Sequence, residues 1–406
     1  MSRVDELITY YSSKKETPWM TLAQIATRRK GFYVTAKTIN EQIDNENGIL
    51  VFGAGSTKAF FNPSQVPEQN IIRDECVIVK SRGYIDFEYC KIPCAHKSEL
   101  WSYIPDKSLI IPKFLYYFLK TIKGKLQTLA RATSVKIPQL SVGDTDSLKI
   151  PIPPLPVQDE IVRILDSFTQ LEAELEAELE ARRKQYEYYR DSLIEYSDSQ
   201  LYGGKEFNSY QALELESLTT KPNKINWTYQ EGKDISYIDL SSVDVTTGVI
   251  SETPLISSQN APSRAQQIVH QNDILFGTTR PLQGRVTIVP KKLDEAVCST
   301  GFCVLRLTDE RVYPHFLYHY LKSRSFTNFV ELNQSGANYP SISDKKVKSF
   351  VLPVPPLSEQ QRIVSILDKF DALVNDISVG LPAEIAARRK QYEHYRDQLL
   401  NFEEAK

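Results

Sequence analysis

The pattern of apolar and polar positions along the chain changes character between its segments. In residues 158–197 apolar side chains recur mostly every three or four positions, and no Pro or Gly interrupts them. This spacing predicts one long helix that packs an apolar seam against another helix, about 60 Å long at 1.5 Å per residue. Short β-branched or aromatic runs bounded by turn residues precede and follow this helix. They predict strands at residues 48–53, 76–81, 273–279, 285–290 and 301–307.

The chain also repeats itself. "LPVPPLSEQQRIVSILDKF" from Leu352 matches "IPIPPLPVQDEIVRILDSF" from Ile150 at 11 of 19 positions, with an offset of 202 residues. At the same offset "PKFLYYFLK" from Pro112 recurs as "PHFLYHYLK", and "IPQLS" from Ile137 as "YPSIS". "ARRKQYEYYRD" from Ala181 recurs at an offset of 206 with one difference. Residues 20–110 and 215–310 have diverged almost completely, so the chain is a duplication with constant ends and variable middles.

Each constant segment predicts a defined structure. The Pro-X-Pro-Pro stretch cannot be helical and predicts a stiff, extended connector, after which Gln158 in one copy and Glu359-Gln360 in the other open a helix. In the second copy, Gly380 and Pro382 are expected to break or kink that helix. The FLYYFLK and FLYHYLK segments (114–120, 316–322) predict short helices with a buried aromatic face. The residues expected to form the helix seam and dock other subunits are Gln158, Ile161, Leu165, Phe168, Tyr186, Tyr189, Gln360, Ile363, Leu367, Phe370, Tyr392 and Tyr395.

These elements predict an α+β fold with a pseudo-two-fold internal repeat. Two mixed α/β domains are joined by two long antiparallel helices that form a coiled-coil spacer. The predicted boundaries are residues 1–150 and 201–352 for the two domains, and 151–200 and 353–406 for the helical segments.

Charge is distributed unevenly along the 406 residues. The net charge is −2, but residues 157–198 hold 12 acidic against 5 basic residues, and residues 358–406 hold 9 against 7. Two acidic helical segments therefore mask a charge of +7 on the rest of the chain, which permits phosphate binding without requiring it. No apolar run reaches the roughly 18 residues that span a bilayer, and "MSRVDELITYYSSKKE" lacks the apolar core of a signal peptide. We therefore expect a cytoplasmic protein without membrane association.

Motifs for catalysis are weak. "CKIPCAH" (90–96) offers two Cys and one His, but a closed zinc site needs four ligands and no second pair follows, which favours buried thiols. "FGAGSTKAF" (52–60) is followed by a turn rather than a helix, so it does not fit a dinucleotide or P-loop site. The Asn/Asp-Pro-Pro-aromatic motif that an adenine methyltransferase needs is missing, and none of the five histidines lies in a nucleophile–base pattern. We expect no catalytic residue and no metal.

Polar loops rich in hydrogen-bond donors lie inside each variable middle. Such side chains reach base edges and phosphates, although each stretch taken singly also fits an ordinary surface loop. Two sets on two divergent domains favour recognition. The candidate DNA-binding residues are Arg28, Arg29, Lys30, Lys58, Arg82, Lys136, Gln139, Lys224, Thr278, Thr279, Arg280, Gln283, Arg285 and Asn338.

The doubled PxPPLxxQxxIVxILDxF, the doubled ARRKQYExYRD and the GxxRP loop (277–281) resemble the specificity (S) subunit of type I restriction–modification systems. The resemblance implies that each domain reads one half of an asymmetric, split double-stranded DNA target, and that the helices set the gap between the halves. It implies a non-catalytic chain without a cofactor of its own. Its partners would be two methyltransferase subunits that methylate adenine N6 with S-adenosylmethionine, and restriction/translocase subunits that use ATP and Mg²⁺.

Two other readings stay open beside this one. The chain could be a structural coiled-coil adaptor, or a stand-alone adenine methyltransferase. The repeat "LEAELEAELEA" (171–181) resembles the variable spacer of some members of the family, and it predicts a length-adjustable element.

Overall fold

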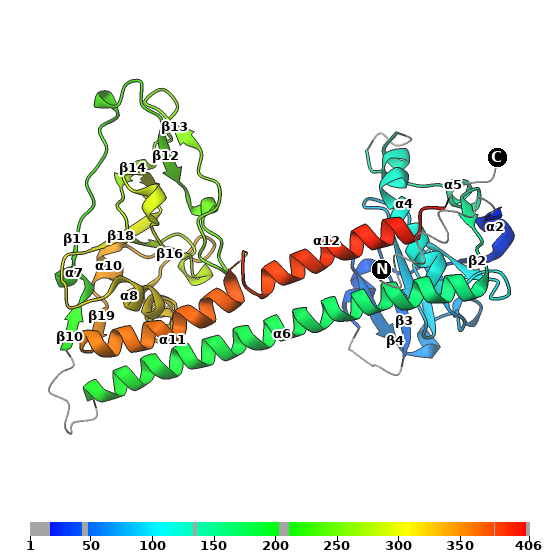
Figure 1. Ribbon diagram of the computed structural model, residues 1–406, viewed down its shortest axis with the longest axis horizontal. Helices are drawn as coiled ribbons and strands as arrows, with labels where there is room; N and C mark the ends of the chain where they lie inside the picture. Colours follow the sequence, from blue (N-terminus) through cyan, green and yellow to red (C-terminus); the bar gives the residue numbers. More distant parts are fainter. Residues whose placement is uncertain (1–16, 43–47, 133–135, 203–210, 377, 403–406) are drawn as a thin grey trace, which may run out of the picture. The chain divides into compact units, whose positions relative to one another are not determined.

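The computed structural model describes residues 17–42, 48–132, 136–202, 211–376 and 378–402 (Figure 1). The stretch that we compared with a signal peptide, residues 1–16, lies outside these ranges. The chain forms two compact units. Unit 1 comprises Met1–Ala173 and Ala387–Lys406, and unit 2 comprises Glu174–Ala386.

Unit 1 contains three small sheets. Their strand orders are β2-β8-β5-β6, β4-β3-β7 and β1-β9. The strands are β1 (Trp19–Thr21), β2 (Ala26–Lys30), β3 (Ile49–Phe52), β4 (Lys58–Phe61), β5 (Cys76–Lys80), β6 (Asp86–Cys90), β7 (Cys94–His96), β8 (Trp101–Pro105) and β9 (Lys149–Pro151). The helices are α2 (Leu22–Ile25), α3 (Ala36–Asn40), α4 (Pro112–Ala132) and α5 (Val142–Asp146), followed by the beginning of α6 (Leu155–Tyr202).

Unit 2 has the corresponding sheets β11-β18-β15-β16, β13-β12-β17-β14 and β10-β19. Its strands are β10 (Gln211–Glu214), β11 (Thr219–Thr220), β12 (Ile235–Ile238), β13 (Leu255–Ile256), β14 (Ala265–Ile268), β15 (Ile274–Gly277), β16 (Val286–Ile288), β17 (Val297–Ser299), β18 (Phe302–Leu307) and β19 (Val351–Val354). Its helices are α7 (Leu215–Leu218), α8 (Pro314–Leu321), α9 (Arg324–Asn333), α10 (Asp344–Lys348), α11 (Leu357–Asn375) and the start of α12 (Leu381–Leu399).

The two variable middles share one topology despite their divergent sequences. In each unit the central strand, β5 or β15, pairs antiparallel with both of its neighbours. A parallel pair, β3–β7 or β12–β17, lies in the second sheet. All five strands predicted from sequence are present, and the FGAGSTKAF segment forms the turn between β3 and β4, as expected.

The constant segments form the predicted connectors and helices. The extended Pro-rich stretches contribute β9 and β19, which pair with β1 and β10. The helices that follow begin at Leu155 and Leu357, three and two residues earlier than predicted; the first includes Pro156, which a helix tolerates in its first turn. The second copy breaks between Asn375 and Leu381, as predicted. At this break a Cβ on Gly380 would lie 2.5 Å from the carbonyl oxygen of Ala372, so the position requires glycine.

Within each unit the long helices run antiparallel. In unit 1, Phe168 of α6 contacts Tyr395 of α12, whereas Glu172, one turn later, pairs with Arg389. A later residue of α6 therefore contacts an earlier residue of α12, as expected for antiparallel helices. The predicted α+β class with a repeated architecture and paired helices is confirmed. The prediction of a short helix at FLYYFLK was wrong in length only, because this segment lies at the start of the 21-residue α4.

Each unit buries its own core against these helices. In unit 1 the aromatic face of α4, including Phe114 and Phe118, packs with β5, β8 and Leu165 of α6. In unit 2, Phe316 and Tyr320 of α8 pack with β15, β18 and Leu367 of α11. The aromatic segments thus serve core packing, as the sequence indicated.

Candidate nucleic-acid interface and helical joints

Two loops of unit 2, residues 278–285 and 334–342, lie side by side; we call them the second loop pair. Thr279 forms a β-bridge with Ser341, and the Arg280 amide donates to the Pro340 carbonyl at 2.8 Å. The Ile342 amide donates to the Thr278 carbonyl at 3.0 Å. The structure therefore brings together six of the predicted residues, namely Thr278, Thr279, Arg280, Gln283, Arg285 and Asn338.

Unit 1 builds the same arrangement from residues 81–84 and 136–140, the first loop pair. Arg82 forms a β-bridge with Gln139, and the Gly83 amide donates to the Pro138 carbonyl at 2.8 Å. The Leu140 amide donates to the Ser81 carbonyl at 2.9 Å. The second loop of each pair is related by the 202-residue offset of the repeat. Arg82 and Gln139, both predicted from sequence, are brought together here.

The turn in both loop pairs needs a left-handed residue. Gly83 has φ +79°, which costs glycine nothing, whereas Arg280 occupies the equivalent position at φ 48°. A non-glycine residue in this region carries strain of about 1 kcal/mol or more. Arg280 is exposed, and its guanidinium carbon lies 5.1 Å from the ring centre of Tyr339. The strain indicates that the arginine side chain is kept for a purpose other than folding.

The second loop pair also holds buried polar atoms without partners. Among the described residues, three buried side-chain atoms lack a hydrogen bond, and two of them, Arg285 Nε and Gln334 Oε1, belong to these loops. Gln283 and Asn338 are exposed, while Thr278 is buried and donates its hydroxyl to the Gly301 carbonyl at 2.8 Å. Buried unpaired polar groups cost about 1–3 kcal/mol each in a folded protein, which favours a site completed by a ligand.

The other predicted residues lie on different elements. Arg28, Arg29 and Lys30 lie on β2, where Arg28 stands 3.9 Å from Asp146 and Arg29 donates to the Gln69 carbonyl at 2.7 Å. The rest are Lys58 at the start of β4, exposed Lys136 in the first loop pair, and Lys224, which forms a β-bridge with Gln267. Their roles in binding stay predictions.

A buried glutamine fixes each helix start to its own unit. The Gln158 side chain donates to the carbonyls of Leu109 at 3.0 Å and Pro153 at 2.8 Å, and accepts from the Ile111 amide at 2.8 Å. Gln360 repeats this set with the carbonyls of Arg311 and Pro355, both at 2.7 Å, and the Tyr313 amide at 2.8 Å. Each pair of partners is 202 residues apart, and both glutamines are 0% exposed. Every polar atom of both amide groups is thus bonded.

About two turns further along, an aspartate ties each helix to the aromatic segment of its unit. Asp166 accepts hydrogen bonds from Lys113 at 2.7 Å and Tyr117 at 2.6 Å. Asp368, its repeat equivalent, instead lies 3.3 Å from His315 Nδ1 and 2.7 Å from His319 Nε2. The geometry recurs, but the donors in unit 2 can titrate near neutral pH.

The local electrostatics of this second aspartate follow from these contacts. Partial burial opposes ionisation of Asp368, but the hydrogen bonds from both histidines hold its pKa well below the usual range. The hydrogen bond to Asp368 raises the pKa of His315. Burial lowers the pKa of His319, which is 0% exposed. In unit 1, burial and the bond to Asp166 raise the pKa of Tyr117, so this phenol stays protonated into the alkaline range.

Aromatic stacking completes both joints. Phe168 stacks on Tyr395 with ring centres 5.6 Å apart, and Phe370 stacks on Tyr189 at 5.4 Å. The predicted seam residues Tyr186 and Tyr392 each carry an arginine over the ring, at 5.6 and 5.7 Å. The predicted aliphatic residues Ile161, Leu165, Ile363 and Leu367 are buried. Sequence reasoning selected these seam residues but missed Asp166 and Asp368, although both stand in the repeated "ILD".

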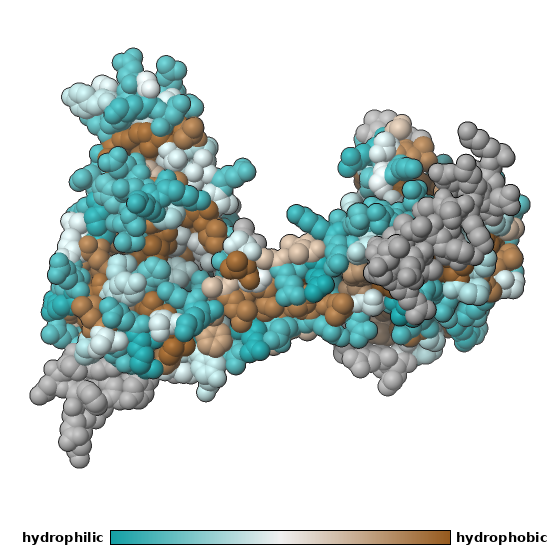
Figure 2. All heavy atoms as spheres, in the orientation of Figure 1, coloured by the Kyte–Doolittle hydropathy of each residue, from teal (hydrophilic) through white to brown (hydrophobic). Residues whose placement is uncertain are grey.

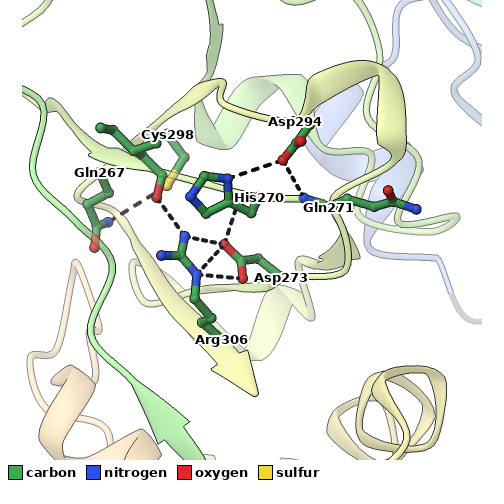
Figure 3. Close-up of polar contacts among 8 residues, drawn as sticks. Gln267, His270, Gln271, Asp273, Asp294, Cys298 and Arg306 are labelled. Atoms are coloured by element: carbon green, nitrogen blue, oxygen red, sulfur yellow. Dashed lines mark hydrogen bonds and ion pairs between the residues drawn. The ribbon is translucent and has the colours of Figure 1, made fainter. Parts of the chain in front are cut away.

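A separate ion pair holds the strands of unit 2 together (Figure 3). Arg306 of β18 reaches Asp273 at 2.7 Å with one guanidinium nitrogen and at 3.0 Å with Nε, and also donates to the Ile268 carbonyl at 3.0 Å. Asp273 accepts from the His270 amide at 2.8 Å, and its side chain is 3% exposed. These contacts join β14 to the sheet that contains β15 and β18. A fully bonded pair of this kind serves structure rather than catalysis.

The cysteines in the first unit are buried thiols. Cys76 Sγ and Cys94 Sγ lie 3.6 Å apart, and a hydrogen bond with Cys94 together with burial raises the pKa of Cys90. The described part of the chain contains no group of three or more His, Cys, Asp or Glu side chains that could hold a metal ion. In the same part, no helix combines the length and the apolarity needed to cross a membrane.

Comparison with known proteins places this geometry in a family. The family model "Type I restriction modification DNA specificity domain" matches residues 15–181 and again residues 215–387. The chain is 32% identical to the Escherichia coli "Type I restriction enzyme EcoR124I/EcoR124II specificity subunit" over 414 aligned residues, covering 95% of each chain. It is 30% identical to the Haemophilus influenzae "Putative type I restriction enzyme specificity subunit S.HindORF215P", covering 95% of this chain and 96% of the relative.

A solved structure supports the fold independently. The type I restriction–modification S subunit from M. genitalium matches 95% of this chain and 97% of its own, with a TM-score of 0.55 at 15% identity. Two copies of the family domain, each followed by an equivalent helical joint, fit the matches to whole specificity subunits. The chain belongs to the family of type I restriction–modification DNA specificity subunits.

Proposed function

We propose that this chain is the DNA-recognition subunit of a type I restriction–modification complex, in which each unit binds one half of an asymmetric, split target. The paired helices fix the spacing between the two half-sites and dock two methyltransferase subunits. The observation that carries the proposal is the duplicated joint. The same glutamine contacts, and an aspartate at the same position, hold two units whose loop sequences have diverged, so the attachment is maintained while the reading surface differs.

Base recognition is assigned to the two loop pairs. Arg280 presents an exposed guanidinium on a strained turn, and an arginine that donates two hydrogen bonds to guanine is the commonest specific contact in the major groove. Arg285 and Gln334, whose Nε and Oε1 are buried without a partner, lie in the same two loops. Arg82, Lys136 and Gln139 fill the corresponding place in unit 1. Gln334 was not among the candidate residues named from sequence, because the burial of its Oε1 without a partner is visible only in the fold.

Docking of methyltransferase subunits is assigned to the helices. Apolar residues reach the surface along them (Figure 2), among them Leu171 at 45% exposure, Tyr188 at 69% and Leu373 at 37%. We infer that these side chains contact the partner, because covering exposed apolar surface is favourable. We infer that S-adenosylmethionine, ATP and Mg²⁺ bind to the methyltransferase and restriction subunits, and that this chain supplies no catalytic group.

The decisive experiment is a genome-wide map of N6-methyladenine in the source strain, with and without the gene. Loss of one asymmetric split motif, methylated on both strands, is the expected result, and it would define both half-sites. A methylome that is unchanged while the methyltransferase subunits are present and active would contradict the proposal. Co-purification of the chain with those subunits separates an idle partner from a wrong assignment.

A further inference from the structure

Each loop pair exposes one tyrosine. Tyr339 in the second loop pair is 72% exposed, and Tyr84 in the first is 66% exposed. The two are not equivalent in the repeat. Tyr84 follows the left-handed residue in the leading loop, whereas Tyr339 precedes Pro340 in the trailing loop. Both units therefore carry a tyrosine close in sequence to the equivalent β-bridge, but unit 1 supplies it from the leading loop and unit 2 from the trailing loop.

A cation covers one face of each ring. The Arg280 guanidinium lies 5.1 Å from the centre of Tyr339, and Lys123 Nζ lies 5.5 Å from the centre of Tyr84. Because both residues remain well over half exposed, the cation does not enclose the ring, and aromatic surface stays open to solvent. Two divergent units thus share an exposed tyrosine backed by a positive charge.

The backbone around both tyrosines is held firmly. Ser335 and Ser341 exchange two hydrogen bonds of 2.8 Å across the loop that carries Tyr339. In the same loop Gly336 has φ +97°, and a Cβ there would lie 2.9 Å from the Tyr339 carbonyl oxygen. Around Tyr84, the Gln127 side chain donates to the Gly83 carbonyl at 3.1 Å and accepts from the Ile85 amide at 2.8 Å. Both rings are therefore presented on rigid supports.

We propose that Tyr339 and Tyr84 each stack their open surface on a nucleobase of the half-site that their unit binds. This inference rests on the proposed function and adds to it an aromatic contact with the π-face of a base. In a duplex the faces of the bases are covered by their neighbours, so each ring would enter a base step that the bound half-site opens, as wedge side chains do in bent DNA. Once the step is open, stacking of a base on an aromatic side chain is largely independent of sequence. The neighbouring cation is attracted to the tyrosine ring, and its positive charge also attracts a DNA phosphate. The tyrosines anchor the loops, while the polar side chains beside them select the sequence.

The test uses the full chain assembled with its methyltransferase subunits and a duplex carrying the mapped target. Tyr339→Ala is expected to weaken binding about 5- to 100-fold, and Tyr339→Phe to retain nearly all of it, because stacking needs the ring and not the hydroxyl. Tyr84→Ala should act in the same way through the first half-site. Tyr229→Ala is the matched control, since Tyr229 is 79% exposed in unit 2 but lies outside the loop pair.

A double-mutant cycle separates stacking on DNA from support of Arg280. If Tyr339 stacks on a base, Tyr339→Ala keeps its effect in an Arg280→Gly background. If the effect disappears there, Tyr339 only positions the arginine and the inference is overturned; an unchanged affinity in the single variant overturns it as well. Absence of target-specific binding by the unaltered complex would instead overturn the proposed function, and this inference with it.

Discussion

Replacing Gln360 with leucine tests the joint of unit 2 most directly. The substitution keeps a side chain of similar size but removes three hydrogen bonds at a fully buried site, those with the carbonyls of Arg311 and Pro355 and with the Tyr313 amide. A buried group left without its partner costs about 1–3 kcal/mol. Because losses at one site are not additive and the backbone relaxes, we expect unit 2 to lose at least about 3 kcal/mol of unfolding free energy.

The measurement is urea unfolding of the full chain, with hydrogen exchange used to assign the loss to one unit. Exchange should accelerate first at the Tyr313 amide, which donates to Gln360. Gln361→Leu is the control, because Gln361 is the exposed neighbour on the same helix. Gln158→Leu should produce the same loss in unit 1, where the contacts are identical in kind. Equal unfolding energies for the Gln360 and Gln361 variants would refute the reasoning.

Three further outcomes follow from the geometry. Arg280→Gly should raise unfolding free energy by about 1 kcal/mol by removing backbone strain, yet weaken target binding by about 1–3 kcal/mol; a variant that binds normally would contradict the assigned role. Burial lowers the pKa of His319, so below the ordinary value near 6.5 the unfolded chain binds a proton that the folded unit does not, and the stability that this residue contributes falls as the pH drops from 7 to 5; His315, whose pKa is raised, contributes in the opposite direction. His319→Tyr, which copies Tyr117 of unit 1, should reduce that fall in urea titrations at the two pH values; an identical fall would refute the assignment. Deleting one four-residue unit from residues 171–181 shortens α6 by about 6 Å and should change the gap between half-sites without altering either half, whereas methylation mapped to an unchanged gap would contradict this role.

Much of the fold could be predicted because its signals are local. Short β-branched runs located the strands, the uninterrupted three-four spacing located α6, and Gly380 located the break between α11 and α12. The pairing of β1 with β9 could not be predicted, because those strands are more than 120 residues apart and no local pattern specifies their partner. The common topology of the two middles was hidden for the same reason. Strand order depends on which surfaces bury together, and many sequences satisfy one order.

The candidate site, too, could be predicted from the sequence only in part. Donor-rich loops could be recognised from composition, and the repeat indicated that residues 137–141 and 339–343 are equivalent. That these loops bridge to residues 82 and 279 emerges only when the chain folds. The left-handed conformation of Arg280 carries no sequence signal, because arginine is not typical of that region. Asp166 and Asp368 were missed because their partners lie about 50 residues away on another helix.

The two joints show which features of the attachment are fixed. Both keep the glutamine with its three bonds and the aspartate with its two donors, but the donors are Lys113 and Tyr117 in one unit and His315 and His319 in the other. The donors lie in the repeated segments that begin α4 and α8, at positions where the two copies differ, whereas the acceptors lie on α6 and α11 at a position where the copies agree. A recognition unit therefore needs only to supply two donors at this spacing in order to dock. This requirement explains how the reading surfaces diverged while the helices that hold them did not.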